Sequence, residues 1–324
     1  MSILQILDIG LAGLVLAVAA WTVFARDAFA AVVGFVAYGL LLSLVWVRLF
    51  AVDVALTEAA IGSGEHPTIT HQPTSGVLLI GAAGRLRKVE ASRDDELPGA
   101  SLRLFAAALC IFVTLVLAGV VLSLPDPGPT LAPEAARHLA ETGLGNPITA
   151  VLLSYRSFDT MLEKVVLVLA VVGVWSLAAD QYWGGAAGNP RGAEPDGTRA
   201  LLAQVLPPLG ILIGIHMVWV GADEPGGAFQ GGAILAAMWM ITMMAGLTEM
   251  PSIRSRLLRL VLVAGPAVFV AVGVAGVAFA SGVFAYPTGF AKPLILFIEA
   301  FMTLSIAVTL PVLVAGPPKR LRQQ

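Results

Sequence analysis

The chain has 324 residues, of which 58% are hydrophobic and 12% are charged, and its mean hydropathy is +0.88. A soluble core of this length could not bury so much apolar surface, so the composition excludes an ordinary soluble domain. The single cysteine, Cys110, lies inside an apolar run, which excludes a disulfide framework and a cysteine-ligated metal or iron–sulfur site. A formal net charge of -2 argues against a nucleic-acid partner. We predict an all-α, polytopic integral membrane protein without a cofactor.

Apolar runs of roughly 20 residues each predict about nine transmembrane helices. The runs are Ile3–Phe24, Ala28–Phe50, a broken run Val52–Leu86, Leu102–Leu124, Thr160–Ala179, Leu201–Val220, Phe229–Leu247, Leu257–Ala280 and Leu294–Ala315. The first run lacks a basic n-region and an A-x-A cleavage site, so we expect a retained span and not a signal peptide. Most Lys and Arg residues fall on alternate loops or at the C-terminus, which predicts an N-out, C-in orientation.

Two changes of composition divide the sequence into three predicted modules. Arg85–Gly99 is charged and contains a proline near its end, and Tyr182–Thr198 is rich in glycine and proline. The predicted modules are residues 1–98, 99–185 and 186–324. We find no internal sequence repeat of the kind that marks inverted-repeat transporters.

The third apolar run contains an interruption. Gly64–Ser75, GEHPTITHQPTS, places two prolines in the run, so we predict a helix broken at membrane depth, with an extruded hairpin as the alternative. His66 and His71 lie five positions apart in this stretch without supporting ligands, so we expect no metal site there.

A glycine-rich stretch from Gly221 to Gly232, GADEPGGAFQGG, joins two apolar runs. Glycine permits a positive φ and close approach of other groups, and a proline stops the preceding helix. We expect the backbone and amide donors at the start of the next helix to face the membrane boundary. The residues of its second part, here called the signature segment, are Pro225, Gly226, Gly227, Ala228, Phe229, Gln230, Gly231 and Gly232.

The signature segment, PGGAFQGG, resembles the PGGGFQGG motif in the B subunit of Mrp-type multisubunit sodium/proton antiporters and in the matching subunit of energy-converting hydrogenases. Ala228 stands where that motif has glycine. A tight turn between two spans is an alternative explanation of the same residues.

Two further stretches resemble parts of the same machines. RDAFAAVVGF at residues 26–35 and DVALTEAAIG at residues 53–62 are similar to the D module of membrane-bound hydrogenases, which is equivalent to a segment near the C-terminus of the large Mrp A protein. SYRSFDTMLE at residues 154–163 resembles the hydrogenase E module. The three resemblances cover most of the chain in the order D-like, E-like, B-like.

Ionisable residues inside predicted spans are costly and are therefore candidates for an ion or proton path. Asp53 and Glu58 lie roughly 140° apart around a helix, so we do not expect them to chelate one ion together. Glu58 lies deeper in its predicted span and is the better candidate for proton transfer. A hydrogen bond from a neighbouring helix is the alternative role of this carboxylate.

Three ionisable residues open the fifth predicted span. Asp159 and Glu163 are four positions apart on one helix face, and Lys164 follows directly. Such a group can hold or pass a proton, because each protonation state shifts the pKa of its partners. Acids placed for the helix dipole at a helix start are the alternative explanation.

Two more candidates lie well inside apolar runs. His216 can titrate near neutral pH, although a histidine bonded to a neighbouring helix would look the same in sequence. Glu299, in ILFIEAFMTL, is the acid farthest from water, and a partner in another subunit is its alternative role.

The resemblances imply a membrane subunit of an Mrp-type antiporter in the cell inner (plasma) membrane, exchanging H⁺ for Na⁺ or another monovalent cation. Its implied partners are other membrane subunits and the lipid bilayer, and it is expected not to be an enzyme. Two alternatives stay open: a membrane-arm subunit of a redox-driven pump, and a purely structural adaptor whose buried charges only satisfy one another.

Overall fold

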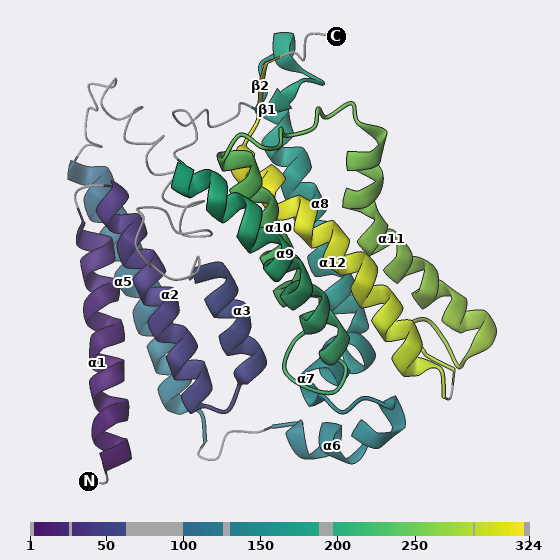
Figure 1. Cartoon of the computed structure of the whole chain (residues 1–324). Coiled ribbons are helices and arrows are strands. Elements are labelled where there is room, and N and C mark those ends of the chain that lie inside the picture. Colours follow the sequence, from purple (N-terminus) through teal and green to yellow (C-terminus); the bar gives the residue numbers. More distant parts are fainter. Residues whose placement is uncertain are drawn as a thin grey trace.

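The structure is a computed structural model that describes residues 3–25, 28–62, 100–125, 130–187, 197–287 and 289–320 (Figure 1). Its long helices are α1 (Ile3–Phe24), α2 (Ala28–Arg48), α5 (Ala100–Ser123), α8 (Ser157–Ser176), α9 (Gly197–Val220), α10 (Ala228–Met244), α11 (Arg256–Phe279) and α12 (Ala291–Ala315). Its shorter helical elements are α3 (Val52–Gly62), α6 (Ala132–Arg137), α7 (Pro147–Ala150), a π-helical turn (Val151–Tyr155) and 3-10 turns at Leu139–Thr142 and Asp180–Tyr182.

The predicted helical membrane architecture is confirmed in its coarse form. Six helices in the described part of the chain are long and apolar enough to cross a membrane, namely α1, most of α2, most of α5, residues 201–220 of α9, α11 and α12. Helix α10 is equally apolar in character but shorter. The total of nine spans and the orientation stay predictions, and the predicted break in the third helix lies at residues outside the described ranges.

One pair of strands was not predicted. Strands β1 (Ala186–Ala187) and β2 (Pro318–Arg320) pair antiparallel, with Ala186 opposite Arg320. Strands of two and three residues are too short to produce an alternating sequence pattern. The pair joins the segment after α8 to the segment after α12.

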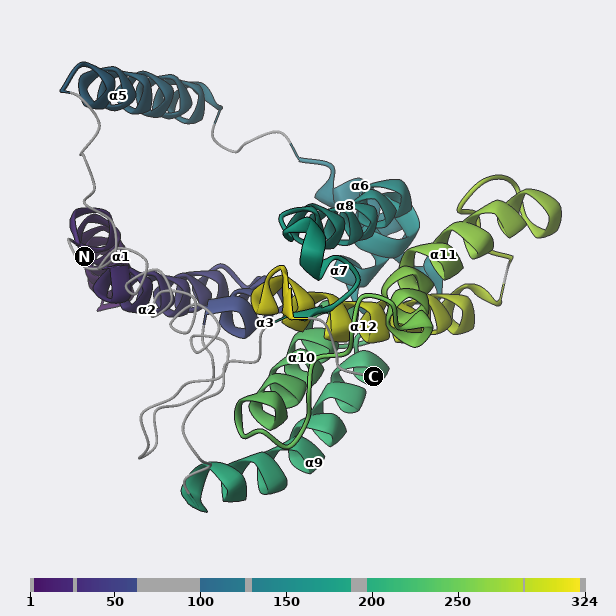
Figure 2. The ribbon, with the colours of Figure 1, turned by 90° about the horizontal axis from the view of Figure 1, so that it is seen from above.

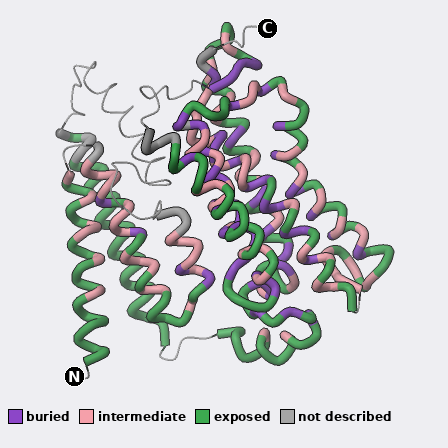
Figure 3. The backbone as a smooth tube through the Cα atoms, in the orientation of Figure 1, coloured by how far each residue is buried: buried purple, intermediate pink, exposed green. Residues whose placement is uncertain are grey.

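Helix α12 lies at the centre of the C-terminal group of helices. Figure 2 shows α8, α10 and α11 around it, and α9 packs against the outer side of α10. In its most apolar stretch 56% of the residues are buried, against none in α1, and the burial pattern in Figure 3 follows this arrangement. The N-terminal helices are therefore covered mainly by something other than this chain.

The N-terminal helices contact one another in sequence order, α1 with α2 and α2 with α3. Arg48 Nε donates to Asp8 Oδ1 at 2.8 Å and joins the first two. Helix α3 also contacts α10 and so links this group to the C-terminal one. Figure 2 shows α5 apart from the other helices, and every side chain described in it is exposed.

Small residues bring α10 close to both of its neighbours. A Cβ added at Gly231 would lie 2.7 Å from the carbonyl oxygen of Gly214 in α9, and one at Gly232 would lie 2.8 Å from Ile306 Cβ in α12. Both distances are shorter than a normal contact, so only glycine fits at these two positions without displacement of a neighbour.

A proline inside α11 has a partner in α12. Pro266 cannot donate to the carbonyl of Leu262, one turn earlier, and this carbonyl instead accepts from Ser305 Oγ at 2.6 Å. The polar group freed by the proline is thereby satisfied across the helix interface.

Candidate functional site

The signature segment closes a tight loop between α9 and α10. Gly227 has a φ of +123°, in the region that favours glycine, and its amide donates to Met217 O at 2.9 Å. A Cβ at Gly226 would lie 2.5 Å from the same carbonyl oxygen. The loop therefore folds back on the last turns of α9, and its remaining amides point toward other elements.

Asp53, at the start of α3, binds this loop. Its Oδ1 accepts from the Gly226 amide at 3.0 Å and from Asn146 Nδ2 at 3.2 Å, and the residue is only 8% exposed. Charge-assisted hydrogen bonds of this kind are among the stronger ones in proteins. The carboxylate is thus held by donors from two different elements.

Gln230 fixes α3 on α10 from the other side. Its Nε2 donates to Asp53 O at 3.2 Å and to Thr57 Oγ1 at 2.9 Å. We expected the donors at this helix start to face the membrane boundary, and the structure instead uses them inside the chain. The reason is that α3 and α12 cover the N-terminal end of α10.

Asn146 is a contact residue that the sequence did not reveal. Its Oδ1 accepts from Ile148 N at 2.9 Å and caps α7, while its Nδ2 donates to Gly221 O and Glu224 O as well as to Asp53. An asparagine before a proline is a usual helix cap, so the cap could have been predicted from the sequence. Its contacts across the fold could not.

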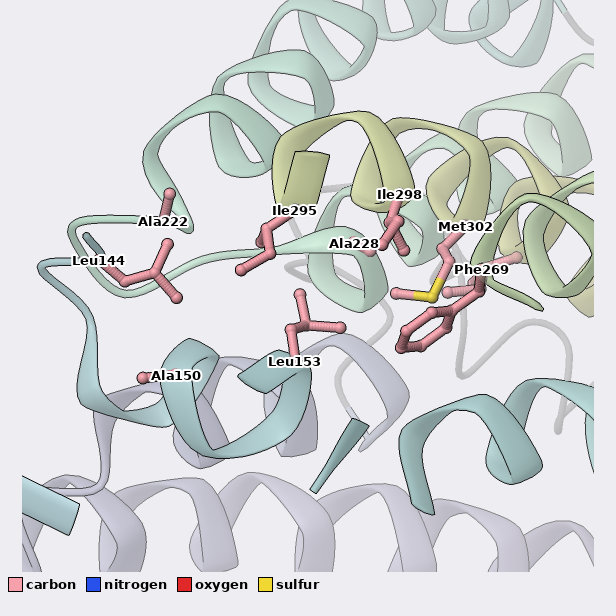
Figure 4. Packing of buried hydrophobic residues seen from close by; sticks show 10 residues of the cluster. Leu144, Ala150, Leu153, Ala222, Ala228, Phe269, Ile295, Ile298 and Met302 are labelled. Carbon is pink, nitrogen blue, oxygen red and sulfur yellow. The ribbon is translucent and has the colours of Figure 1, made fainter. Parts of the chain in front are cut away.

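Glu299 lies on the opposite side of the α10 N-terminus. Its Oε1 accepts a long bond, 3.4 Å, from the amide of Ala228, and its Oε2 is buried without a partner among the described residues. The residue is 3% exposed, and Figure 4 shows the neighbouring Ile298 and Met302 packed near Ala228. Apolar side chains therefore surround the carboxyl group.

The energetic balance at Glu299 is unfavourable for a charge. Removing a carboxylate from water costs on the order of several kcal/mol in real proteins. A helix N-terminus returns up to about 2 kcal/mol in partly buried geometries. A single long hydrogen bond of Glu299 does not make up the difference.

Lys164 contacts the same helix start from α8. It is 6% exposed, and its Nζ lies 5.4 Å from the centre of the Phe229 ring and 2.9 Å from Glu163 Oε1. A cation over an aromatic face is stabilised by about 0.5–2 kcal/mol, depending on desolvation. The side chain of Glu163 is 56% exposed, so this pair connects the interior with the outer face of α8.

The first residues of α10 therefore contact three ionisable groups from three other helices. Ala228 contacts Glu299, Phe229 contacts Lys164, and the Gln230 amide binds α3 at Asp53. The structure brings together these three members of the predicted ion path. The space beside Lys164 at α11 and α12 is too narrow for a water molecule in this conformation.

The other predicted path residues lie away from this cluster. Glu58 is half-buried on another side of α3, and Asp159 forms an exposed ion pair with Arg156 at 2.6 Å. His216 is exposed on α9. Their roles in a path stay predictions.

One tyrosine nearby is a structural donor. Tyr286, in the loop between α11 and α12, donates to Leu153 O at 2.8 Å. Burial raises the pKa of its hydroxyl to about 12, so it keeps its proton at any physiological pH. Among the described residues, no three His, Cys, Asp or Glu side chains are grouped as a metal site would require.

Two family models match the chain. Residues 13–70 match MbhD, the family described as the D component of MBH, and residues 199–316 match the family described as a domain related to the MnhB subunit of the Na+/H+ antiporter. The chain combines an MbhD segment with an MnhB-related domain. The MnhB-related domain contains the signature segment, Glu299 and His216, and the MbhD segment contains Asp53 and Glu58.

A curated relative matches part of the chain. The A component of the Na(+)/H(+) antiporter of Bacillus subtilis (strain 168) is 28% identical over 157 residues, which is 48% of this chain and 18% of that protein. The chain thus spans less than a fifth of the length of this relative. The N-terminal and C-terminal resemblances noted in the sequence agree with it.

Two solved structures share the fold. A chain of the Mrp complex from Dietzia sp. DQ12-45-1b superposes with a TM-score of 0.70 at 22% identity, over 97% of this chain and 35% of that one. A chain of the membrane-bound sulfane sulfur reductase, an archaeal respiratory membrane complex, superposes with a TM-score of 0.54 at 23% identity, over 65% of this chain and 96% of that one. The MbhD segment and the MnhB-related domain therefore lie in a fold known from multisubunit membrane complexes.

Proposed function

We propose that this chain is a membrane subunit of a multisubunit Mrp-type antiporter that exchanges H⁺ for Na⁺ or another monovalent cation in the cell inner membrane. It contributes part of the ion or proton path and contacts between subunits. The observation that carries the proposal is the start of α10, where three consecutive residues of the MnhB-related domain contact Glu299, Lys164 and Asp53.

The arrangement suits proton handling at a boundary between subunits. Glu299 and Lys164 are buried beside one helix end, whereas Glu163 binds Lys164 and remains exposed. Ionisable groups in membrane helices face a partner or water and not lipid. In this proposal Glu163 connects the buried pair to a neighbouring subunit, and Glu58, Asp159 and His216 meet other subunits on the outer faces of their helices.

The experiment is cation-dependent proton exchange by the intact complex. The complete set of subunits is expressed in a host without its own sodium/proton antiporters, and collapse of a pH gradient on addition of Na⁺ is followed in inverted membrane vesicles. Glu299→Gln and Glu163→Gln should abolish exchange while the complex still assembles. Glu134→Gln, an exposed change in α6, is the matched control and should leave exchange unchanged.

Unchanged exchange by a fully assembled Glu299→Gln complex would remove this residue from the path. Unchanged exchange by both variants would favour the structural adaptor, in which the buried charges only hold elements together.

A second candidate is a membrane subunit of a redox-driven ion pump. The match of residues 13–70 to the MbhD family, a component of MBH, favours it. Purification of the intact complex and identification of its other chains separates the two functions. Partner chains with nickel–iron or quinone-type sites would support redox driving, whereas membrane subunits alone would support antiport.

A further inference from the structure

The two buried carboxylates beside the signature segment have different surroundings. Asp53 Oδ1 accepts from two donors, Gly226 N and Asn146 Nδ2. Glu299 has one long bond from Ala228 N, and its Oε2 is buried and unpartnered among the described residues. One carboxylate is thus stabilised as an anion by its donors, and the other is not.

We propose that Glu299 binds a proton in this conformation and is the proton-binding residue of the cluster, while Asp53 stays a fixed negative charge. The two acids bind amides that are two residues apart in one loop, so their charges repel each other. When two carboxylates share a site, the one with poorer solvation and fewer donors takes up the proton. Participation of this proton in exchange rests on the proposed function, but its binding to Glu299 does not.

The surroundings of Glu299 suit a proton better than a metal cation. A hard cation requires several oxygen ligands. The group that faces Oε1 is an N–H donor, and the nearby Thr303 hydroxyl donates to the backbone carbonyl of Glu299 at 2.7 Å. A proton needs only the one oxygen that is left without a partner.

The other charged groups around α12 do not neutralise Glu299. Helix α10 contains no ionisable side chain. The charged and titratable groups on the other neighbouring elements are Asp53 and Glu58 on α3, Asp159, Glu163 and Lys164 on α8, exposed His216 on α9, Arg256 and Arg259 in the first turn of α11, Tyr286 in the α11–α12 loop, and the Asp223–Lys292 pair. Of the cations, Lys164 is bound to Glu163 and Lys292 to Asp223.

The test is infrared difference spectroscopy of the intact complex as a function of pH. A protonated carboxyl group in apolar surroundings has a carbonyl stretch well separated from that of a carboxylate. We expect this band near neutral pH in the wild-type complex and its loss in Glu299→Gln. Glu163→Gln, whose carboxylate is exposed, should keep the band.

Asp53→Asn gives an independent readout. The asparagine Oδ1 still accepts from Gly226 N, so the loop is kept, but the negative charge is removed. The Glu299 band should remain and titrate at lower pH, because the ionised form is no longer repelled. A band that is absent in the wild type, unchanged in Glu299→Gln, or insensitive to Asp53→Asn would overturn the proposal.

Two points keep the result decisive. If Glu299→Gln does not assemble, the wild-type complex is modified with dicyclohexylcarbodiimide, which reacts with protonated carboxyl groups in apolar sites, and the label is located by mass spectrometry. Label on Asp53 and not on Glu299 would contradict the assignment. A Glu299 band in a complex without exchange would sink the proposed function alone, and exchange without the band would sink this inference alone.

Discussion

Asp53 and Glu299, from opposite ends of the chain, accept hydrogen bonds from the amides of Gly226 and Ala228, which are two residues apart in one loop. The loop between α9 and α10 is therefore held on one side by α3 and on the other by α12. This relationship explains why a segment rich in glycine also contains a glutamine: the glycines allow close approach, and Gln230 binds α3.

Replacement of Asn146 should destabilise the loop and α3 together. Asn146→Ala removes the cap of α7 and one of the two donors to Asp53 Oδ1. Loss of a cap costs about 1 kcal/mol, and a buried acceptor left with fewer donors costs about 1–3 kcal/mol. The thermal denaturation midpoint of the purified complex should fall clearly.

The matched control for this prediction is Ser123→Ala, an exposed hydroxyl on α5 that donates only to Val120 O. Its denaturation midpoint should equal that of the wild type. Equal midpoints for Asn146→Ala and the control would mean that the bonds of Asn146 do not stabilise the loop.

Much of this arrangement follows from local sequence, but the contacts between distant segments do not. The long apolar runs and the start of α10 after Gly227 were predicted, because apolar length and glycine have local effects. Adjacent residues on a helix differ by roughly 100° in direction, so Glu163 and Lys164 were bound to face different ways. Which of them faces inward depends on the packing of α8 against α11 and α12, and no local pattern contains that information.

The roles of the two acids on α3 also depended on the fold. The depth of a residue in an apolar run favoured Glu58 over Asp53, and the structure places Asp53 in the loop contact instead. The cause is the docking of α3 by its first turn against α10, which buries the residue nearest the helix start.

Glycine-to-alanine changes in α10 should separate close packing from helix propensity. Gly231→Ala places a methyl group 2.7 Å from Gly214 O, which forces α9 and α10 apart and should cost about 1–3 kcal/mol. Gly173→Ala in α8 has no atom within 4 Å of its new methyl group, so helix propensity should make it neutral or slightly stabilising. Denaturation midpoints of both variants test this, and a loss of stability in Gly173→Ala equal to that in Gly231→Ala would contradict it.

Lys164 should be needed for exchange and not for assembly. Lys164→Met keeps the length of the side chain and its contact with Phe229, and the unpaired Glu163 left behind is largely exposed. Replacement of a buried charge by an apolar side chain of similar size is often neutral for stability. Exchange should fall at least about tenfold, equivalent to about 1.4 kcal/mol, whereas Lys164→Arg should retain part of it.

Sodium-dependent exchange in vesicles, measured beside the yield of assembled complex, checks this prediction. Full exchange by an assembled Lys164→Met complex would show that the ammonium group only anchors α8 to α10.

His216 should mark a contact between this chain and another membrane subunit. It is exposed on α9 within an apolar span, and a polar side chain at such a position is expected to face protein or water and not lipid. In a Cys110→Ser background, His216→Cys should form crosslinks to a neighbouring subunit with a short thiol-to-amine reagent. Ile211→Cys, exposed roughly 140° away around the same helix, is the control for lipid-facing positions and should crosslink less. Equal crosslinking at the two positions, or none at His216→Cys in the intact complex, would argue that the histidine does not lie at a subunit interface.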